Sequence, residues 1–259
     1  MGRLKRFARD WNKLGKRNPY GAILTGAAGE LPQWTVEQLF ETGQADADRF
    51  IADLERVAPT IRRRHLLDFG CGVGRVTRAL APHFQSVVGV DVASTMISRA
   101  RLLNQAYPNC QFVVTPHAHL RGFETGTFDA IYSRLVLQHI PPPLVCKYIP
   151  ELIRVLAPGG VLMFQMPDEI APEAEDAFST APVIGAGLKS HLPRVLVRAY
   201  RLVKYRFIVD ESMPTMAMFG MRRDHVLQLV SAAGGRVLTT KPDQSHGPNV
   251  PGFEYWITK

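Results

Sequence analysis

Short apolar segments alternate with longer amphipathic ones from residue 45 to residue 167. The apolar segments have the length of strands and are apolar at successive positions, which is typical of parallel strands covered on both faces. The expected strands are 64–70, 85–91, 110–116, 127–135 and 161–167. The expected helices are 45–59, 74–84, 94–106 and 143–160, the last ending on the Pro and Gly of "APGG". This alternation predicts an α/β fold with a Rossmann-like, doubly wound and mostly parallel sheet.

Three further segments lie outside this alternation. In residues 1–17, Leu4, Phe7, Trp11 and Leu14 recur at helical spacing, which predicts an amphipathic helix. Residues 169–216 interrupt the pattern and are expected to form a helical cap. A helix and two strands follow, the last strand antiparallel. We therefore divide the chain into an N-terminal helical segment or lid (1–45), a core (46–168), a cap insertion (169–216) and the C-terminal part of the core (217–259).

Composition places the chain among globular proteins. Its 259 residues are 46% hydrophobic and 21% charged, enough to bury a core of one moderately large domain. No run of eighteen apolar residues occurs, so a membrane-spanning helix is not expected. Cys71, Cys110 and Cys146 lie far apart, which argues against a disulfide framework and a structural zinc site. A reducing compartment, the cytoplasm, is the predicted location.

The net charge of +8 is concentrated at the N-terminus. Residues 1–17 hold seven Lys or Arg and one Asp, whereas the remainder holds 24 basic residues against 22 acidic ones. A nucleic-acid partner is not expected, because such proteins spread their basic residues over a binding face. The basic helix has two readings: a solvated face docked on the domain, or attraction to an anionic membrane surface or substrate.

The stretch "LLDFGCGVGRVTRAL" (66–80) places three glycines, Gly70, Gly72 and Gly74, between a buried strand and a helix. A glycine turn into a helix N-terminus offers backbone N–H groups to a ligand that approaches closely. The dinucleotide pattern requires a third glycine where this chain has Arg75 or Thr77, so a nicotinamide enzyme is disfavoured. The Asp68 carboxylate would repel a pyrophosphate and suits an ammonium or sulfonium group.

A second acidic residue, Asp91, ends the next strand, 21 residues beyond Gly70. At that place a carboxylate can accept two hydrogen bonds from a ribose diol. With the glycine turn at this distance, we interpret Asp91 as a ribose contact rather than as a turn former.

Together these residues resemble the class I S-adenosylmethionine (SAM)-dependent methyltransferases of small-molecule type. The resemblance covers roughly residues 65–167, through "LLDFGCGVGR", "VVGVD", "TFDAIYSRLVLQHI" and "RVLAPGGVLMFQMP" in the family's order. It implies a SAM cofactor, and a lid made by the N-terminal region, where Tyr20, Trp34 and Glu41 are candidates. The Asn/Asp-Pro-Pro-Tyr motif of base-directed members is absent, which again argues against a nucleic-acid substrate.

The resemblance also implies the cofactor contacts. The bend at Gly70–Gly72 would pack against methionine, Asp91 would hold the ribose, and Val92 and Met96 would line the adenine. The segment that usually carries an acid for the adenine amino group here offers His117. The residues implied to bind the cofactor are Asp68, Gly70, Cys71, Gly72, Gly74, Asp91, Val92, Met96, His117, Ser133 and Leu135.

Methyl transfer from a sulfonium mainly requires alignment of the acceptor, but a hydroxyl acceptor also needs a base. His139 of "LQHIPP" is the candidate base, with a purely structural role as the alternative. Asp168 and Glu169 lie at the same sheet edge. The sequence indicates no metal-ligand set, although a divalent metal is compatible with it.

The predicted function is O-methylation of a hydroxyl on a small molecule, such as a sugar, glycolipid or secondary metabolite. The alternatives are N- or C-methylation and a non-catalytic SAM-binding protein. The acceptor is expected to be a small molecule or glycan. Homodimer formation and peripheral membrane contact through the basic N-terminal helix stay open.

Overall fold

The computed structural model describes residues 2–24, 33–168, 216–245 and 250–259. A seven-stranded sheet with the order β3-β2-β1-β4-β5-β7-β6 forms its centre. Neighbouring strands from β3 to β5 are parallel, and β7 is antiparallel to both β5 and β6. The strands are β1 (His65–Phe69), β2 (Ser86–Asp91), β3 (Cys110–Val114), β4 (Phe128–Ser133), β5 (Leu156–Pro167), β6 (Arg236–Asp243) and β7 (Gly252–Thr258). The predicted fold class is confirmed.

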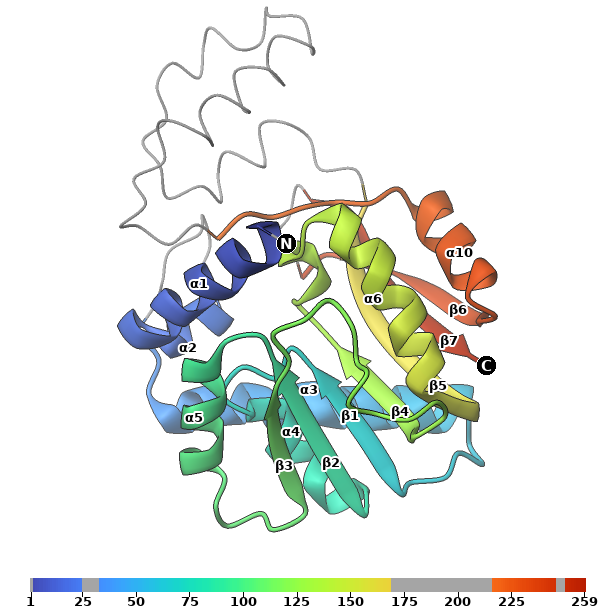
Figure 1. Cartoon of the computed structure of the whole chain (residues 1–259). Coiled ribbons are helices and arrows are strands. Elements are labelled where there is room, and N and C mark those ends of the chain that lie inside the picture. Colours follow the sequence, from blue (N-terminus) through green and yellow to red (C-terminus); the bar gives the residue numbers. More distant parts are fainter. Residues whose placement is uncertain (1, 25–32, 169–215, 246–249) are drawn as a thin grey trace, which may run out of the picture.

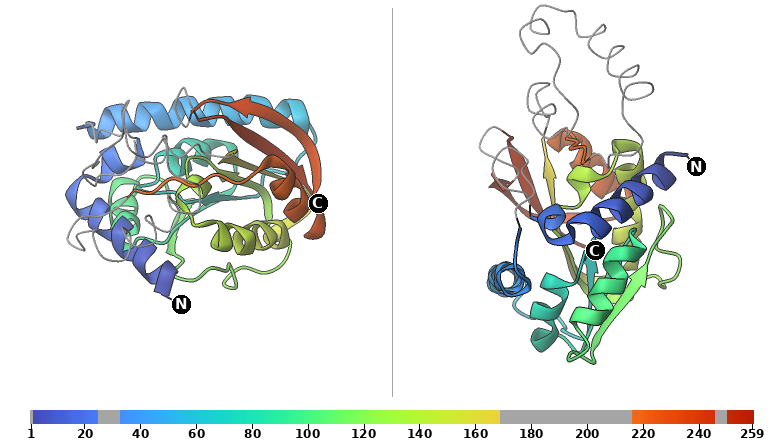
Figure 2. Two further views of the ribbon diagram at one scale, coloured as in Figure 1. Left: turned by 90° about the horizontal axis from the view of Figure 1, so that it is seen from above. Right: turned by 90° about the vertical axis from the view of Figure 1, so that its left-hand side faces the viewer.

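Helices cover both faces of this sheet, which explains why its central strands are apolar at successive positions (Figure 1). On one face α3 (Val36–Val57) and α4 (Arg75–Leu80) pack against β1, β4 and β7. On the other, α6 (Pro142–Val155) and α10 (Arg223–Ala232) enclose the larger apolar cluster. Viewed from above, α3 and α6 lie on opposite sides of the sheet (Figure 2, left). Alternation along β1 sends Leu66 to the α3 side and Leu67 to the α6 side.

Within the described ranges, the remaining helices are α1 (Gly2–Arg17), α2 (Pro19–Ile23), α5 (Ser94–Leu103) and the short 3₁₀ turns η2 (Ala81–His83) and η3 (Leu137–His139). Of these, η2 lies before the amino end of β2, α5 lies beside β2 and β3, and the other three lie near the carboxyl ends of the parallel strands. The predicted N-terminal helix is thus present, and its apolar residue Leu14 is buried with Met96 of α5. Among the described residues, no helix is long and apolar enough to cross a membrane.

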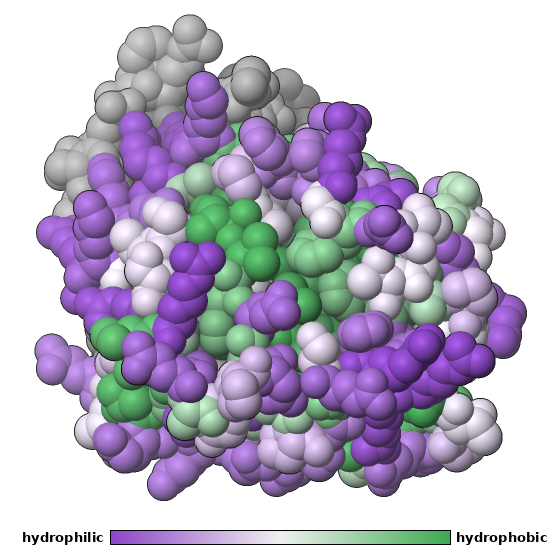
Figure 3. All heavy atoms as spheres, turned by 60° about the horizontal axis from the view of Figure 1, so that its bottom comes forward, coloured by the Kyte–Doolittle hydropathy of each residue, from purple (hydrophilic) through white to green (hydrophobic). Residues whose placement is uncertain are grey.

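Polar and charged side chains surround the lower side of the molecule, and apolar side chains are visible mainly across its centre (Figure 3). Leu102 and Val113, at 67% and 37% exposure, are the large apolar side chains that remain exposed in the described part of the chain. The apolar residues of the sequence pattern are therefore used mainly inside the domain.

Two boundaries predicted from the sequence are wrong. The helix expected from residue 45 begins at Val36, because Thr35 accepts from the Gln38 N–H (3.2 Å) and the Gln38 side chain accepts from the Thr35 N–H (3.1 Å). This helix therefore crosses the 45/46 boundary between lid and core. The helix expected to end at "APGG" ends at Val155 instead, because Leu156 already pairs with Phe128 of β4. Apart from Met216, the cap predicted at 169–216 lies outside the described residues.

Candidate cofactor and acceptor site

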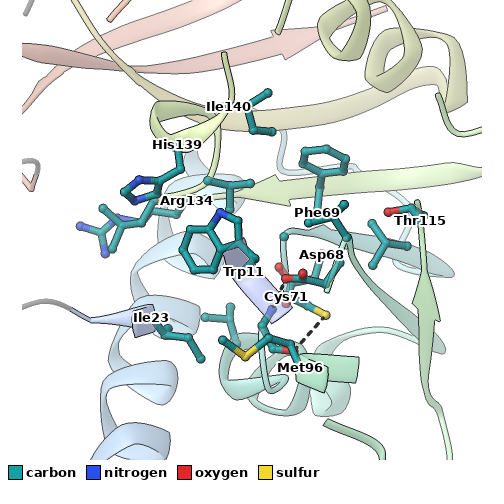
Figure 4. Close-up of a pocket in the computed structure, with 18 of the residues that line it drawn as sticks. Trp11, Ile23, Asp68, Phe69, Cys71, Met96, Thr115, Arg134, His139 and Ile140 are labelled. Carbon is teal, nitrogen blue, oxygen red and sulfur yellow. Dashed lines mark hydrogen bonds between the residues drawn. The ribbon is translucent and has the colours of Figure 1, made fainter. Parts of the chain in front are cut away.

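A cavity lies at the carboxyl ends of β1, β2 and β4, the edge at which parallel α/β sheets bind ligands. Its floor is formed by the bend after β1, by Asp91 and Val92 after β2, and by the segment after β4. Helices α1 and α2 contribute its outer wall through Phe7, Trp11, Ala22 and Ile23, and α5 adds Met96 (Figure 4). The cavity is thus closed on one side by the N-terminal segment.

The bend after β1 depends on its glycines. Gly70, Gly72 and Gly74 have φ angles of +81°, +55° and +80°, a left-handed conformation that other residues adopt only with strain. A Cβ on Gly72 would come 2.9 Å from Cδ1 of Ile23 in the cavity wall. The bend therefore keeps open a space that any side chain would fill.

The sequence analysis expected the N–H groups of this bend to be available to a ligand. In the structure they are already used in hydrogen bonds within the domain. Those of Gly70 and Cys71 donate to the carbonyl oxygen of Val90, at 2.8 and 3.0 Å. That of Gly72 donates to Oδ2 of Asp91 at 3.0 Å. These bonds tie the bend to the end of β2, so both parts of the cavity floor move as one unit.

Two carboxyl groups line this part of the cavity, that of the buried Asp68 and that of the half-buried Asp91. Asp91 accepts from the N–H groups of Gly72 and Ala93, and Asp68 accepts from the Thr77 hydroxyl at 2.6 Å. Burial raises the pKa of each carboxyl to about 6, opposed at Asp68 by the Thr77 hydrogen bond and the Arg75 charge. Because a nearby cation favours their ionised forms, this end of the cavity suits a ligand that carries positive charge.

Most of the predicted cofactor residues are brought together here, but three are not. Asp68, Gly70, Cys71, Gly72, Asp91, Val92, Met96 and Leu135 line the cavity. Gly74 instead begins α4 and packs against Phe112 and Asn104. His117 is exposed and stacks on His119, while Thr115 lines the cavity in its place. Ser133 is buried but lies outside the lining, since its strand neighbours Tyr132 and Arg134 take the cavity side.

His139 lines the cavity but both of its ring nitrogens are engaged. Nδ1 lies 3.0 Å from the carbonyl oxygen of Ala217 and therefore carries the proton, because a carbonyl only accepts. Nε2 lies 3.2 Å from Nε2 of Gln138, which donates to it. Burial lowers the pKa of His139 to about 4, so its imidazole is neutral near pH 7.

Leu135, just after β4, is the residue other than glycine that has a positive φ (+59°) in the described ranges. Such a conformation is costly for a bulky side chain and is found where the surroundings enforce it. Here the Leu135 N–H donates to Oε1 of the buried Gln165 on β5 at 2.9 Å. Next to it, Val136 packs against Gly70, so the segment after β4 contacts the glycine bend directly.

The cavity residues that the sequence analysis missed include Arg75, Tyr132 and Arg134. The two guanidinium groups meet at one carboxylate, Asp46 of α3, with Arg75 Nη1 2.7 Å from Oδ2 and Arg134 Nη1 bonded to Oδ1. The contact that joins these residues is between distant parts of the sequence, since Asp46 lies in a different segment from either arginine. Only the fold brings these residues together.

The N-terminal candidates for the lid are also replaced. Tyr20, Trp34 and Glu41 do not line the cavity, whereas Trp11 of α1 reaches into it, its ring centroid 5.4 Å from that of His139 (Figure 4). The Asn12 Oδ1 fixes α1 to the start of α5 by accepting from the Ser94 hydroxyl and the Thr95 N–H, each at 3.0 Å. The cavity holds about 80 Å³ in this structure.

Comparisons with known proteins agree with this geometry. A family model described as a methyltransferase domain matches residues 67–164. Residues 67–164 are therefore a methyltransferase domain, and the fold is that of solved SAM-dependent methyltransferases. SAM, the cofactor predicted from the sequence, is therefore confirmed for this domain, and the glycine bend with Asp68 and Asp91 fits its ribose and its positive charge. No group of three His, Cys, Asp or Glu that could hold a metal ion occurs among residues 2–24, 33–168, 216–245 and 250–259.

Among curated proteins, the domain is similar to trans-aconitate 2-methyltransferases. That of Azoarcus sp. (strain BH72) is 33% identical over 140 residues, 53% of this chain and 52% of the relative. That of Rhodopseudomonas palustris (strain BisB18) is 32% identical over 142 residues, 54% and 52% of the two chains. The chain thus spans about half the length of these relatives.

Solved structures resemble the chain over nearly its whole length. Magnesium protoporphyrin IX methyltransferase from Synechocystis PCC 6803 with bound S-adenosylhomocysteine (SAH) has a TM-score of 0.60 at 19% identity, covering 97% of this chain and 98% of that one. A SAM-dependent methyltransferase from Leishmania major has a TM-score of 0.62 at 14% identity, covering 99% and 83%. At these identities the likeness concerns the fold.

Proposed function

We propose that this chain is an enzyme that transfers the methyl group of SAM to an oxygen atom of a small acceptor. The observation that carries the proposal is the cavity itself, in which two carboxyl groups face one side and the segment after β4 faces the other. In this reaction an acceptor oxygen bonds to the methyl carbon while the carbon–sulfur bond breaks. The bonding pair stays on sulfur, and neutral SAH leaves.

The acidic end of the cavity would hold SAM. Asp91 would accept from the ribose hydroxyls with the lone pairs that its backbone bonds leave unused, and Asp68 would lie near the cationic part of the cofactor. Trp11 would cover the bound cofactor from α1 and exclude water. SAM itself supplies the activated methyl group, so the protein mainly positions the acceptor.

The state of His139 bears on which oxygen is methylated. A hydroxyl acceptor must lose a proton, and His139 is the base that we predicted for it. A carboxylate is already ionised at neutral pH and needs no base. Since both nitrogens of His139 are engaged and its pKa is about 4, the geometry favours an ionised acceptor oxygen. The similarity to trans-aconitate 2-methyltransferases, whose name describes a carboxylic acid acceptor, supports the same choice.

A hydroxyl acceptor with His139 as its base is the second candidate. It is favoured by the location of His139 in the cavity wall, beside Trp11. Displacement of the Gln138 amide from Nε2 would free the lone pair that a base requires.

The test is turnover of SAM to SAH, measured with a panel of small carboxylic acids, sugars and phenols. Methylation of any panel member, confirmed by mass spectrometry, supports the enzyme. His139→Gln should leave carboxylate methylation within about threefold, but should lower hydroxyl methylation about 10²-fold or more if His139 is a base. The exposed His117→Gln is the matched control. Tight SAM binding without methylation of any acceptor would favour a non-catalytic SAM-binding protein.

A further inference from the structure

Three polar atoms in the cavity wall are buried without a hydrogen-bond partner among the described residues. They are Nε of Arg75, the hydroxyl of Tyr132 and Nε of Arg134. Arg75 and Tyr132 are 4% and 2% exposed, and the Arg134 side chain is 12% exposed. Buried donors almost always find an acceptor, and each one left without costs about 1–3 kcal/mol. Three such donors in one wall of a cavity therefore indicate a ligand that accepts hydrogen bonds.

The charges around these atoms specify that ligand further. Asp46 is the carboxylate that Arg75 and Arg134 share, and its Oδ1 also lies 3.8 Å from Arg49. Both oxygens of Asp46 are thus used by the outer nitrogens of the two arginines, while the inner Nε–H groups remain without an acceptor. Arginine stays protonated at every relevant pH, so the unused donors call for an anion, and guanidinium groups match a carboxylate in shape.

Arg134 lies on the side of the cavity away from the Asp68 carboxyl. Figure 4 shows Arg134 beside His139, with the Trp11 indole drawn between it and the pair Asp68 and Cys71. Arg75 and Tyr132 lie nearer to Asp68, since the Arg75 charge acts on that carboxyl and Tyr132 pairs with Asp68 between β1 and β4. The three residues thus extend from Asp68 towards His139, and an acceptor held by Arg134 would lie on the His139 side.

We propose that Arg75, Tyr132 and Arg134 form a subsite that binds a carboxylate of the acceptor, so that the substrates of this enzyme are small organic acids. This inference rests on the proposed function. The subsite anchors the acceptor by charge-assisted hydrogen bonds, with Asp46 holding the two guanidinium groups in place.

The experiment measures binding and turnover separately. Calorimetry with SAH and with 5′-methylthioadenosine, which lacks the amino acid part, reports on the cofactor. Calorimetry with trans-aconitate, succinate and benzoate in the presence of SAH reports on the acceptor, even if none is methylated. Arg134→Met should weaken binding of the best acid at least tenfold, the usual effect of losing a charged hydrogen bond, and should change SAH affinity less than twofold. Tyr132→Phe should weaken the acid about threefold or more.

Tyr132→Phe also shows whether weaker binding of the acid arises from the lost hydroxyl or from a destabilised fold. Its hydroxyl has no partner among the described residues, so its removal should leave the melting temperature unchanged or higher. Arg49→Met is the matched control, since Arg49 approaches the same Asp46 but does not line the cavity. This variant should retain wild-type affinity for both ligands.

Two results would overturn the subsite. In the first, Arg134→Met weakens SAH tenfold while 5′-methylthioadenosine binds as before, which would assign the arginines to the methionine carboxylate. In the second, uncharged amides of the same acids bind as well as the acids. The proposed function fails separately, if no member of the panel is methylated although the acids bind through Arg134.

Discussion

Substitution of Gly70 by alanine tests whether the bend after β1 and the segment after β4 are as tightly joined as the structure indicates. At φ +81°, alanine pays the left-handed backbone penalty of about 1–2 kcal/mol. Its Cβ would also lie 2.9 Å from the Cβ of Val136 and nearer still to both Val136 methyl carbons, so this segment must shift. Overpacking of that kind adds about 1–3 kcal/mol. The expected destabilisation of Gly70→Ala is therefore about 2–5 kcal/mol.

Gly234 provides a matched control for the backbone part of this penalty. Its φ is also +81°, but nothing lies within 4 Å of the Cβ position. Gly234→Ala should therefore lose only the strain of about 1–2 kcal/mol. In a thermal melt, at about 2–4 °C per kcal/mol for a protein of this size, Gly70→Ala should melt about 4–20 °C lower and Gly234→Ala about 2–8 °C lower.

Removal of the clashing methyl groups distinguishes the two contributions. In the double variant Gly70→Ala/Val136→Ala the steric part should vanish, and most of the difference from Gly234→Ala with it. SAH affinity should fall in Gly70→Ala and stay unchanged in Gly234→Ala, which is remote from the cavity. Equal melting temperatures for the two single variants would refute the close contact between Gly70 and Val136.

Three further variants or conditions probe the charged groups of the cavity. Asp91→Ala should weaken SAH by about 1.5–3 kcal/mol in calorimetry, the size of a hydrogen bond to a charged group, and a loss under about threefold would count against a ribose contact. Burial raises the pKa of Asp68 and Asp91 to about 6, so both are largely protonated below that pH. The affinity for SAM should therefore increase from pH 5 to pH 7, and the affinity for SAH, whose sulfur carries no charge, should increase less. Equal slopes for the two ligands would contradict this assignment. Burial lowers the pKa of His139 to about 4. Between pH 6.5 and pH 4 the unfolded chain therefore binds a proton at this residue that the folded chain does not bind. Acidification across this range should lower the free energy of unfolding by about 3 kcal/mol. In His139→Gln, urea denaturation should show a flatter pH dependence, and an unchanged slope would show that His139 is not buried in its neutral form.

The sequence predicted the strands well because their signal is local. Each is a short apolar run bounded by turn residues, and β2, for example, was expected at 85–91 and spans Ser86–Asp91. The start of α3 could also have been predicted from the sequence, since Thr35 and Gln38 have the spacing of a capping box. The start of β5 could not, because Leu156 becomes a strand residue through its pairing with Phe128, almost thirty positions away in the chain.

The site was predictable where one segment carries it and not where two segments share it. Asp68, Gly70 and Gly72 follow from the order of residues after β1. Ser133 lies outside the cavity lining for a physical reason. All six positions of β4 are buried, so its pattern does not reveal which alternate residues face the cavity. Only packing against α3 assigns Tyr132 and Arg134 to that side.

The contacts of His139 show why loss of activity in a histidine variant would not identify a base. Its Nδ1–H holds the carbonyl of Ala217, and the neighbouring Gln138 carbonyl accepts from the Phe219 N–H at 2.6 Å. Residues 217–219 are thus fixed to the cavity rim by η3. Removal of the imidazole would release this contact, and a loss of methylation within about threefold would follow from that alone, without any proton transfer being lost. A base is distinguished by the pH dependence of kcat/KM, because an anchoring histidine with both nitrogens engaged gives no inflection of its own near neutral pH.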